Sequence, residues 1–312
     1  MCLYPKLIQN PRYLPNKKNG YKPPKFKDER TLLVPIGCGY CIECRRQKSR
    51  EWQVRLNEDI KHEKNKVMIT LTFSDKALND LTQEAELNNI YKSEVNEIAT
   101  LAVRRFLERW RKKFKKSIKH WLVTELGHNG TERIHLHGIL YTDRTDLIEK
   151  YWSYGYVYIG DYVNEKTINY IVKYITKLDS DHINYKPKIL CSKGIGKNYI
   201  FSKNIEINYF NSKETKEYYQ TRTGTKLNLP KYYRNYIYTD DEKELLWINK
   251  LDKEERWVCG EKVSIKESET DYFKLLYFHQ QKNKRLGYGK CDNWIIELYK
   301  NSRKLLNKRK RD

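Results

Sequence analysis

The stretch Arg133-Ile-His-Leu-His-Gly-Ile-Leu-Tyr141 decides the fold and carries the first candidate site. Its alternating pattern and its apolar, β-branched and aromatic residues predict a strand. Because side chains two residues apart point to the same face of a strand, His135 and His137 are expected to share one face, and Leu136 the opposite, buried one. A pair of imidazoles on a sheet face is half of a divalent-metal site, although two ordinary surface histidines produce the same pattern.

A third metal ligand is expected from the segment just before this strand. Trp121-Leu-Val-Thr-Glu125 also predicts a strand, and Gly127-His-Asn-Gly130 predicts the turn of a hairpin that would bring Glu125 near the histidines. Two histidines and one carboxylate leave positions open on a metal ion for substrate oxygens. The alternatives are a solvent-facing or Arg133-paired Glu125, with His128 or Glu132 as third ligand.

The flanking segments complete the pattern of an α+β fold. They predict strands at 67–73 and 156–159 and helices at 93–116 and 164–177. This order is typical of a ferredoxin-like or RRM-like antiparallel sheet with its helices on one face. We expect three regions: a basic N-terminal arm with a Cys-rich knuckle and a helix (1–60), the α+β core (61–180), and a basic, mostly helical extension (181–312), with residues 240–280 helical.

The last core helix carries a second candidate site. Tyr170, Lys173, Tyr174 and Lys177 fall on one arc of that helix at about 100° per residue. A phenol is a poor nucleophile near neutral pH unless a neighbouring lysine or metal ion favours the phenolate. The pattern therefore indicates two nucleophilic tyrosines with two lysine partners. The alternative is an amphipathic helix whose tyrosines cover the sheet edge.

The cysteines indicate a structural metal. Cys38-Gly-Tyr-Cys41-Ile-Glu-Cys44 has two-residue gaps that let thiolates converge on one zinc ion, and Cys2 is the expected fourth ligand. Three reduced cysteines in a loop, or an iron–sulfur cluster, are the alternatives. A set of 7 cysteines, odd and sparse, argues against a disulfide framework.

The charge indicates a polyanionic partner. Lys and Arg total 62 against 40 Asp and Glu, a net charge of +22, while 13% aromatic residues are typical of a folded chain. DNA, RNA and an anionic membrane surface all fit this charge. The basic segments 45–50, 104–119 and 282–311 are candidates for backbone contacts. The apolar stretches are far shorter than the roughly 18 residues of a spanning helix.

In combination these motifs resemble the HUH endonucleases, which start rolling-circle DNA replication. The resemblance lies in His135-Leu-His137, in Tyr170-xxx-Tyr174 with its two lysines, and in the strand Met68-Ile-Thr-Leu-Thr72. More narrowly, the chain resembles the replication initiators of gokushovirus-type Microviridae over roughly residues 1–235. That likeness is carried by four further segments: the four cysteines, Arg50-Glu-Trp52, Thr124-Glu125-Leu-Gly127 and Gly194-Ile-Gly196.

The resemblance implies a metal-dependent, site-specific DNA endonuclease and strand transferase. His135 and His137, with Glu125, would hold Mg²⁺ or Mn²⁺. Tyr170 or Tyr174 would attack single-stranded or supercoiled origin DNA and become a 5′-phosphotyrosine, leaving a 3′-OH primer, and the other tyrosine would rejoin the strand. Lys173 and Lys177 would stabilise phosphate or phenolate charge. A host helicase and polymerase are the implied partners, no membrane is needed, and the bacterial host cytoplasm is the implied location.

Two other classes of function stay open. A non-catalytic zinc-containing nucleic-acid-binding protein explains the charge and the Cys38–Cys44 segment, but makes the histidine pair and the tyrosine face a coincidence. Another HUH enzyme, a relaxase or a single-tyrosine transposase, explains the histidines. The pair Tyr170 and Tyr174 argues against the single-tyrosine type, and the cysteines favour the phage initiator.

Overall fold

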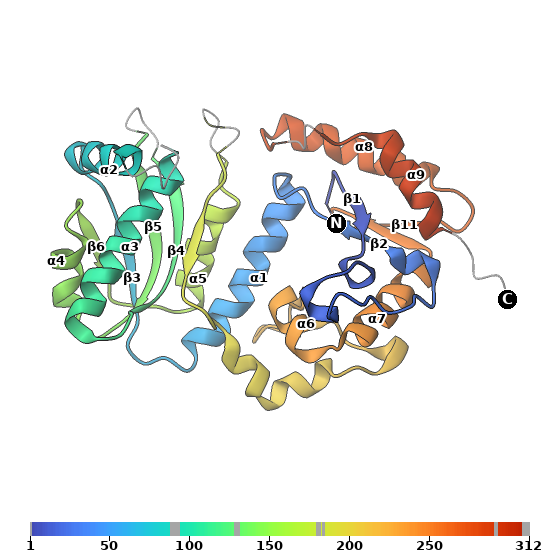
Figure 1. The fold of residues 1–312 in the computed structure, drawn as a ribbon, viewed down its shortest axis with the longest axis horizontal. Helices are drawn as coiled ribbons and strands as arrows, with labels where there is room; N and C mark the ends of the chain where they lie inside the picture. The colour runs from blue at the N-terminus through green and yellow to red at the C-terminus, as the bar shows by residue number, and fades with distance from the viewer. Residues whose placement is uncertain are drawn as a thin grey trace.

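The computed structural model describes residues 2–87, 94–127, 132–178, 182, 185–289 and 293–307. Its central element is a five-stranded antiparallel sheet in the order β6-β3-β5-β4-β7 (Figure 1). The strands are β3 (Val67–Leu71), β4 (Lys119–Leu126), β5 (Ile134–Tyr141), β6 (Val157–Gly160) and β7 (Ile189–Cys191). The predicted combination of helices with an antiparallel sheet is confirmed, and β7 adds a strand from the segment assigned to the C-terminal extension.

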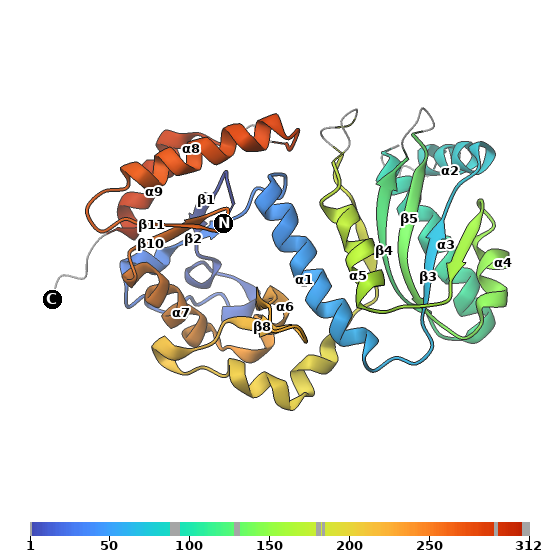
Figure 2. The ribbon, with the colours of Figure 1, turned by 180° about the vertical axis from the view of Figure 1, so that it is seen from behind.

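Helices cover both faces of the sheet, so the prediction of helices on one face is wrong. One face packs against α2 (Asp75–Leu87), α3 (Val95–Phe114) and α4 (Ile148–Trp152), and the other against α1 (Ile42–Ile60) and α5 (Glu165–Val172). The physical reason lies in β4, where Leu122 is buried towards α3 and Trp121 and Val123 are buried towards α1 and α5. A central strand that is apolar on both faces needs cover on both. Accordingly, α3 lies in front of the sheet in Figure 1 and behind it in Figure 2.

The N-terminal arm is folded onto the C-terminal part of the chain. It forms a two-stranded sheet of β1 (Lys6–Gln9) and β2 (Leu33–Ile36), with three short 3₁₀ helices: η1 (Pro11–Tyr13), η2 (Lys17–Asn19) and η3 (Glu29–Leu32). The Gln280 side chain donates a hydrogen bond to the Leu3 carbonyl, and the Trp294 indole donates one to the Pro5 carbonyl. The sequence indicated an extended basic arm, but these contacts bury its start.

The C-terminal part contains helices and short hairpins. Its helices are α6 (Lys231–Ile237), α7 (Asp240–Asp252), α8 (Thr270–Arg285) and α9 (Ile296–Leu306), and its further strands are β8 (Tyr218–Gln220), β9 (Lys226–Asn228), β10 (Glu255–Val258) and β11 (Glu261–Ser264). The β10–β11 hairpin interrupts the stretch 240–280 that was predicted to be helical. Its turn residues Cys259 and Gly260 have φ values of 50° and 93°, which is the backbone of a tight two-residue hairpin turn rather than of a helix.

Helix α1 is the structural link between these parts. Figures 1 and 2 show it between the sheet on one side and the N- and C-terminal segments on the other. The glycine loop before η6 (Lys197–Phe201) closes against it: Gly196 has φ 77°, donates its N–H to Asp59 Oδ1 at 2.7 Å, and leaves no room for a Cβ, which would lie 2.5 Å from the Arg55 carbonyl oxygen. This loop therefore has a packing role. Among the described residues, no helix is both long and apolar enough to cross a membrane.

Candidate functional site

The β4–β5 register brings the predicted metal ligands to one face of the sheet. Glu125 lies directly opposite His135, and Val123 lies opposite His137. Glu125 Oε2 is 2.6 Å from His137 Nε2, while His137 Nδ1 is 3.0 Å from the hydroxyl of Thr70 on β3. The Thr70 contact leaves Nε2 facing the carboxylate, which is the orientation that an outer-shell hydrogen bond imposes on a metal-binding histidine.

Glu125 is held between a histidine and a lysine. Its second oxygen forms an ion pair with Lys177. Burial opposes ionisation of Glu125, but the hydrogen bonds from His137 and Lys177 outweigh it, so the pKa of this carboxyl lies below its ordinary value. Arg133, the alternative partner, pairs with Asp75 at 2.6 Å. A negatively charged Glu125 beside two imidazoles is a donor set that suits a hard divalent cation.

The remaining ligand candidates lie around this pair. The His135 ring is 6.4 Å from the His137 ring, centroid to centroid. Burial lowers the pKa of His135, and the charge on His137 lowers it further, which keeps the ring neutral and able to donate a lone pair. Glu132 faces His182 at 3.4 Å, away from Glu125, and His128 lies outside the described residues. His135, His137 and Glu125 thus fit the predicted ion by donor type and by shared face.

Both tyrosines of the predicted nucleophile helix lie beside the histidines. Tyr170 is in α5, and Tyr174 follows in the 3₁₀ turn η5 (Lys173–Ile175). The Tyr174 ring stacks on His137 with centroids 4.0 Å apart and planes 4° apart, and its hydroxyl donates to the Tyr170 hydroxyl at 2.7 Å. Tyr174 is 5% exposed and Tyr170 is 41% exposed. Burial, the hydrogen bond to Tyr170 and the charge of Glu125 all raise the pKa of Tyr174.

The two lysines occupy different places. Lys173 is exposed, with its Nζ 3.9 Å from the centre of the Tyr170 ring and 5.2 Å from that of Tyr174. Lys177 is turned to Glu125. Lys177, Glu125 and Tyr174 line a small hollow at the end of β4. One lysine is therefore placed to meet an incoming anion next to the exposed tyrosine, and the other compensates the buried carboxylate.

Helix α1 fixes the end of the tyrosine helix through residues that the sequence did not single out for this role. Ser49 donates to the Val172 carbonyl at 3.1 Å. Arg45 donates to the carbonyls of Lys177 and Tyr185 at 3.3 and 2.9 Å. Arg45 was counted among the candidate DNA contacts at 45–50, but it is buried. Only the fold reveals this use, because a basic residue beside other basic residues carries no signal of burial.

The four cysteines form a second cluster. The Sγ atoms of Cys2, Cys38, Cys41 and Cys44 all lie within 4.8 Å of one another, and the described part of the chain holds no other such group of three or more metal-ligand side chains. The backbone N–H groups of Cys38 and Tyr4 point at Cys2 Sγ, at 3.2 and 3.3 Å. Hydrogen bonding to Cys2 lowers the pKa of Cys38 and of Cys41. Four convergent sulfurs with amide donors suit a tetrahedral zinc ion.

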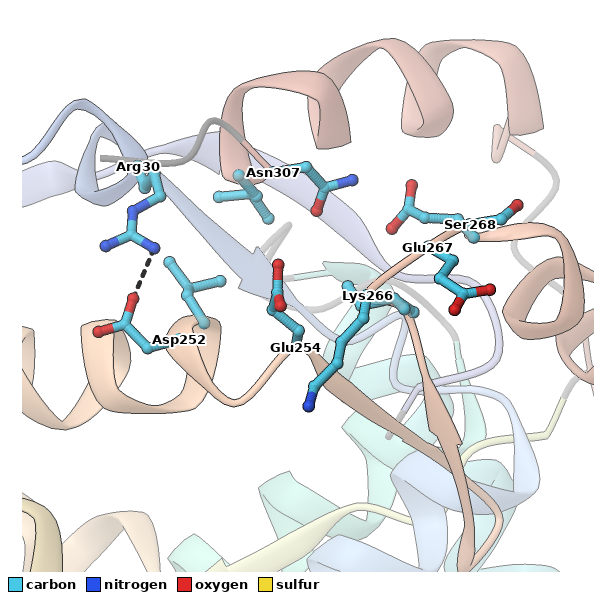
Figure 3. A pocket seen from close by; sticks show the side chains of 11 residues that line it. Arg30, Asp252, Glu254, Lys266, Glu267, Ser268 and Asn307 are labelled. Atoms are coloured by element: carbon cyan, nitrogen blue, oxygen red, sulfur yellow. Dashed lines mark hydrogen bonds and ion pairs between the residues drawn. The ribbon is translucent and has the colours of Figure 1, made fainter. Parts of the chain in front are cut away.

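A cavity of about 470 Å³ lies away from both clusters, at the junction of η3, α7, β11 and α9. Figure 3 shows its labelled lining, with the Arg30–Asp252 ion pair at one side and Glu254 and Glu267 around the hollow. The carboxylates in this lining outnumber the bases and would repel phosphate. The cavity is therefore a poor match for the polyanion that the net charge indicates.

The basic half of α3 lies on the sheet face opposite the histidines. The apolar side of α3, with Ala102, Phe106 and Trp110, packs into the cluster beneath Leu122 and Leu136. Its lysines and arginines at 104–119 therefore sit across the sheet from His137, apart from Lys119, which pairs with Asp59 and Glu63. This placement separates most of that basic segment from the candidate site.

A protein with this sheet, this residue set and this helix matches a known class. Residues 66–179 match a family of viral replication proteins, described under the heading Replication-associated protein ORF2, and this region contains the histidine pair, Glu125 and both tyrosines. The match supports a role in the initiation of viral replication.

A particular relative agrees with the family match. The chain is 28% identical over 227 residues to the "Replication-associated protein ORF2" of Spiroplasma virus 4. The alignment covers 64% of this chain and 66% of that protein, slightly under two thirds of the relative's length. No solved structure matches the chain.

Proposed function

We propose that the protein is a replication initiation endonuclease of the HUH type, which nicks one strand of origin DNA and later rejoins it. The observation that carries the proposal is the contact between the two halves of the site: Tyr174 stacks on His137, and His137 in turn contacts Glu125. The strand order β6-β3-β5-β4 supports it, because β3 and β4 run parallel with β5 between them, as in a split β-α-β unit.

The metal ligands in this proposal are His135, His137 and Glu125, with Mg²⁺ or Mn²⁺ as the ion. When bound, such an ion polarises the non-bridging oxygens of the scissile phosphate and orients it. Thr70 keeps the His137 ring in place through Nδ1, and Lys177 compensates the charge of Glu125. The stacked Tyr174 limits the access of water to His137 from its own side.

We assign the first attack to Tyr170. It is the exposed tyrosine, it accepts the hydrogen bond of Tyr174, and it has the Lys173 ammonium 3.9 Å from its ring centre. Both contacts favour negative charge on the Tyr170 oxygen. That oxygen bonds to phosphorus, the P–O3′ bond breaks, and the proton lost by the phenol ends on the leaving 3′ oxygen. The products are a 5′-phosphotyrosine and a 3′-OH primer.

Tyr174 would act in the second transfer. Once Tyr170 is esterified, it can no longer accept that hydrogen bond, which frees the Tyr174 hydroxyl one helical turn away. Attack by Tyr174 on the regenerated origin then releases a 3′-OH, which can displace Tyr170 from its phosphate and close the circle. The released 3′-OH at the first nick requires a host polymerase, and duplex origins require a host helicase, in the cytoplasm of a bacterial host.

The test uses labelled single strands that tile both strands of the DNA element encoding the chain. They are incubated with the protein and Mn²⁺ and run on a denaturing gel. We expect one strand to form a covalent protein–DNA adduct that is lost with EDTA. Tyr170→Phe should abolish it, while Tyr174→Phe should retain most of the first cleavage.

The controls separate the alternatives. Tyr209→Phe, on an exposed tyrosine outside the sheet, should leave the adduct unchanged. Adduct formation by the Tyr170→Phe/Tyr174→Phe double variant would contradict the assignment of nucleophiles. Tight binding of every strand without any adduct would instead favour a non-catalytic nucleic-acid-binding protein.

We also propose that Cys2, Cys38, Cys41 and Cys44 hold a structural zinc ion. The pairs Cys38–Cys44 and Cys2–Cys41 have sulfurs 4.0 and 3.9 Å apart, close to the edge of a ZnS₄ tetrahedron with bonds of about 2.3 Å. The ion would join the N-terminus to the start of α1. Native protein should contain one equivalent of zinc, Cys41→Ser should lose it, and Cys191→Ser should keep it. Metal-free native protein would refute the site.

A further inference from the structure

The half of the sheet face beside the histidines is uncovered and aromatic. The face that α1 and α5 cover over β4 and β5 continues across β3 to the edge strand β6. In the ladder, Thr70 lies opposite both His137 and Tyr158. Residues opposite one another point to the same face, so His137, Thr70 and Tyr158 form one row across three strands.

A second tyrosine extends this surface. Tyr156 precedes Tyr158 by two residues and therefore shares its face. Its carbonyl accepts hydrogen bonds from the N–H and the hydroxyl of Thr72. Between and beyond these tyrosines, Val157 is buried and Ile159 partly buried against the opposite cluster, as the alternation of a strand requires.

Both rings are open to solvent. Tyr156 is 67% exposed and Tyr158 is 50% exposed. Large apolar rings side by side on an exposed edge are a liability unless something covers them. Two strand spacings of about 4.8 Å separate Tyr158 from His137, so the rings lie roughly 10 Å from the histidines, measured along the row.

The backbone holds Tyr156 in this place. A Cβ on Gly155 would lie 2.6 Å from the Thr72 carbonyl oxygen, so only glycine lets the chain approach β3 this closely. The Trp152 indole donates to the same carbonyl at 2.8 Å. The start of β6 is therefore fixed by packing, and the two rings stand on a rigid strand rather than on a loop.

We propose that Tyr156 and Tyr158 form a stacking platform for unpaired bases of the DNA strand next to the scissile phosphate. The inference rests on the proposed function, since it takes the strand to pass over the histidines. Base–aromatic stacking needs exposed rings and no particular sequence, and a chain of net charge +22 attracts the phosphates that carry the bases. The platform would hold the strand in register while Tyr170 attacks.

The row also explains why an aromatic pair is useful here. The candidate site provides charge at one end, from Lys173 and the metal ligands, but its described residues offer little that could grip a base. Tyr156 and Tyr158 supply that grip on the uncovered side, continuous with His137 through Thr70. Stacking there would keep the bases flanking the cut apart from any complementary strand.

The experiment measures binding of a labelled oligo-dT strand, and of an abasic strand of equal length, by fluorescence anisotropy in EDTA. Each of Tyr156→Ala and Tyr158→Ala should weaken oligo-dT binding roughly 5- to 100-fold, with Phe at either position restoring it. Tyr209→Ala, which removes a ring of similar exposure (57%) elsewhere, should change nothing. The salt dependence should stay the same, because phosphate contacts set it.

The abasic strand provides the decisive comparison. Native protein should bind it as weakly as the double alanine variant binds oligo-dT, and the variant should not distinguish the two strands. Equal affinity of native protein for both strands, or full oligo-dT binding by the double variant, would overturn the platform. Since this assay needs no cleavage, adduct formation with unaffected binding would reject the platform alone, and ring-dependent binding without any adduct would reject the proposed nuclease alone.

Discussion

The histidine–tyrosine centre and the cysteine cluster are both groups of metal-ligand side chains, but they are built differently. Around His137 and Glu125 lie polar partners, an exposed tyrosine and an exposed lysine. The cysteines instead belong to an apolar cluster with Leu3, Ile42, Tyr272 and Leu276, which come from the N-terminus, α1 and α8. One centre opens to a substrate, and the other is packed between segments that are distant in sequence.

This difference separates chemistry from assembly. The sheet that carries His137 has its own apolar clusters on both faces, so removing a site side chain should leave the fold intact. The N- and C-terminal segments form a thinner layer, with the four sulfurs at its centre. We therefore expect substitutions at one centre to change the reaction, and substitutions at the other to change stability.

The largest effect is expected at the cysteines. Cys41→Ser removes a buried ligand, and structural zinc contributes about 10 kcal/mol or more to folding in zinc-finger peptides. We expect the layer of α8, α9, β10 and β11 to lose at least about 5 kcal/mol of stability, since part of the zinc contribution is kept by the surrounding apolar packing. Hydrogen exchange should show this loss there and not in β3–β5. Unchanged exchange in α8 would contradict the separation, and Cys191→Ser is the control.

His137→Ala tests the opposite half of the comparison. Loss of a ligand and of the ring under Tyr174 should lower the rate of adduct formation roughly a thousandfold, or about 4 kcal/mol in the barrier. The unfolding midpoint should change little. His120→Ala is the contrast, because His120 is buried on the same sheet against Ser192: it should reduce stability by about 1–3 kcal/mol and leave adduct formation near native. The reverse pattern would refute our distinction.

Much of the site could be predicted from the sequence because local patterns determine it. The two-residue repeat of His135 and His137 and the four-residue repeat of Tyr170 and Tyr174 specify a face once the element is known. The hairpin predicts that Glu125 meets this strand. What meets across the fold could not be predicted: the stacking of Tyr174 on His137, and the burial of Arg45 under the Lys177 carbonyl, depend on how α1 and α5 pack.

The fold shows the same limit. Strands and the long helix follow from periodicity, whereas the cover on both faces depends on α1, whose first half is so basic that its sequence suggests a solvated helix. The β10–β11 hairpin was hidden in a charged, weakly periodic stretch. The pairing of the N-terminal arm with α8 and α9 is non-local, and no short pattern encodes it.

Arg45→Ala tests the link between the two centres. It removes two hydrogen bonds to buried carbonyls, at Lys177 and Tyr185, which we expect to cost about 2–3 kcal/mol in the free energy of unfolding. Adduct formation should also slow, because the end of the tyrosine helix loses its support. Arg46→Ala, one residue along and exposed, should stay within about 0.5 kcal/mol of native. Equal effects from both variants would place Arg45 among ordinary surface charges.

The smallest effect is expected on the far face of the sheet. Arg111, Lys112 and Lys113 lie in the last turn of α3, across the sheet from His137, where they interact favourably with the helix C-terminus, by about 0.3–1 kcal/mol each at most. Replacing all three by alanine should therefore lower stability slightly. It should leave the affinity for single-stranded DNA and its salt dependence close to native.

The salt dependence distinguishes the two faces of the sheet. If the three α3 residues did neutralise phosphates, each loss would reduce the slope of log K against log salt by about one, and a clearly reduced slope would show that the strand also follows α3. Lys173→Ala is the matched comparison: a single exposed lysine beside Tyr170 should weaken binding more than the three α3 substitutions together, because only that charge lies on the face where the histidines, the tyrosines and the uncovered strand β6 meet.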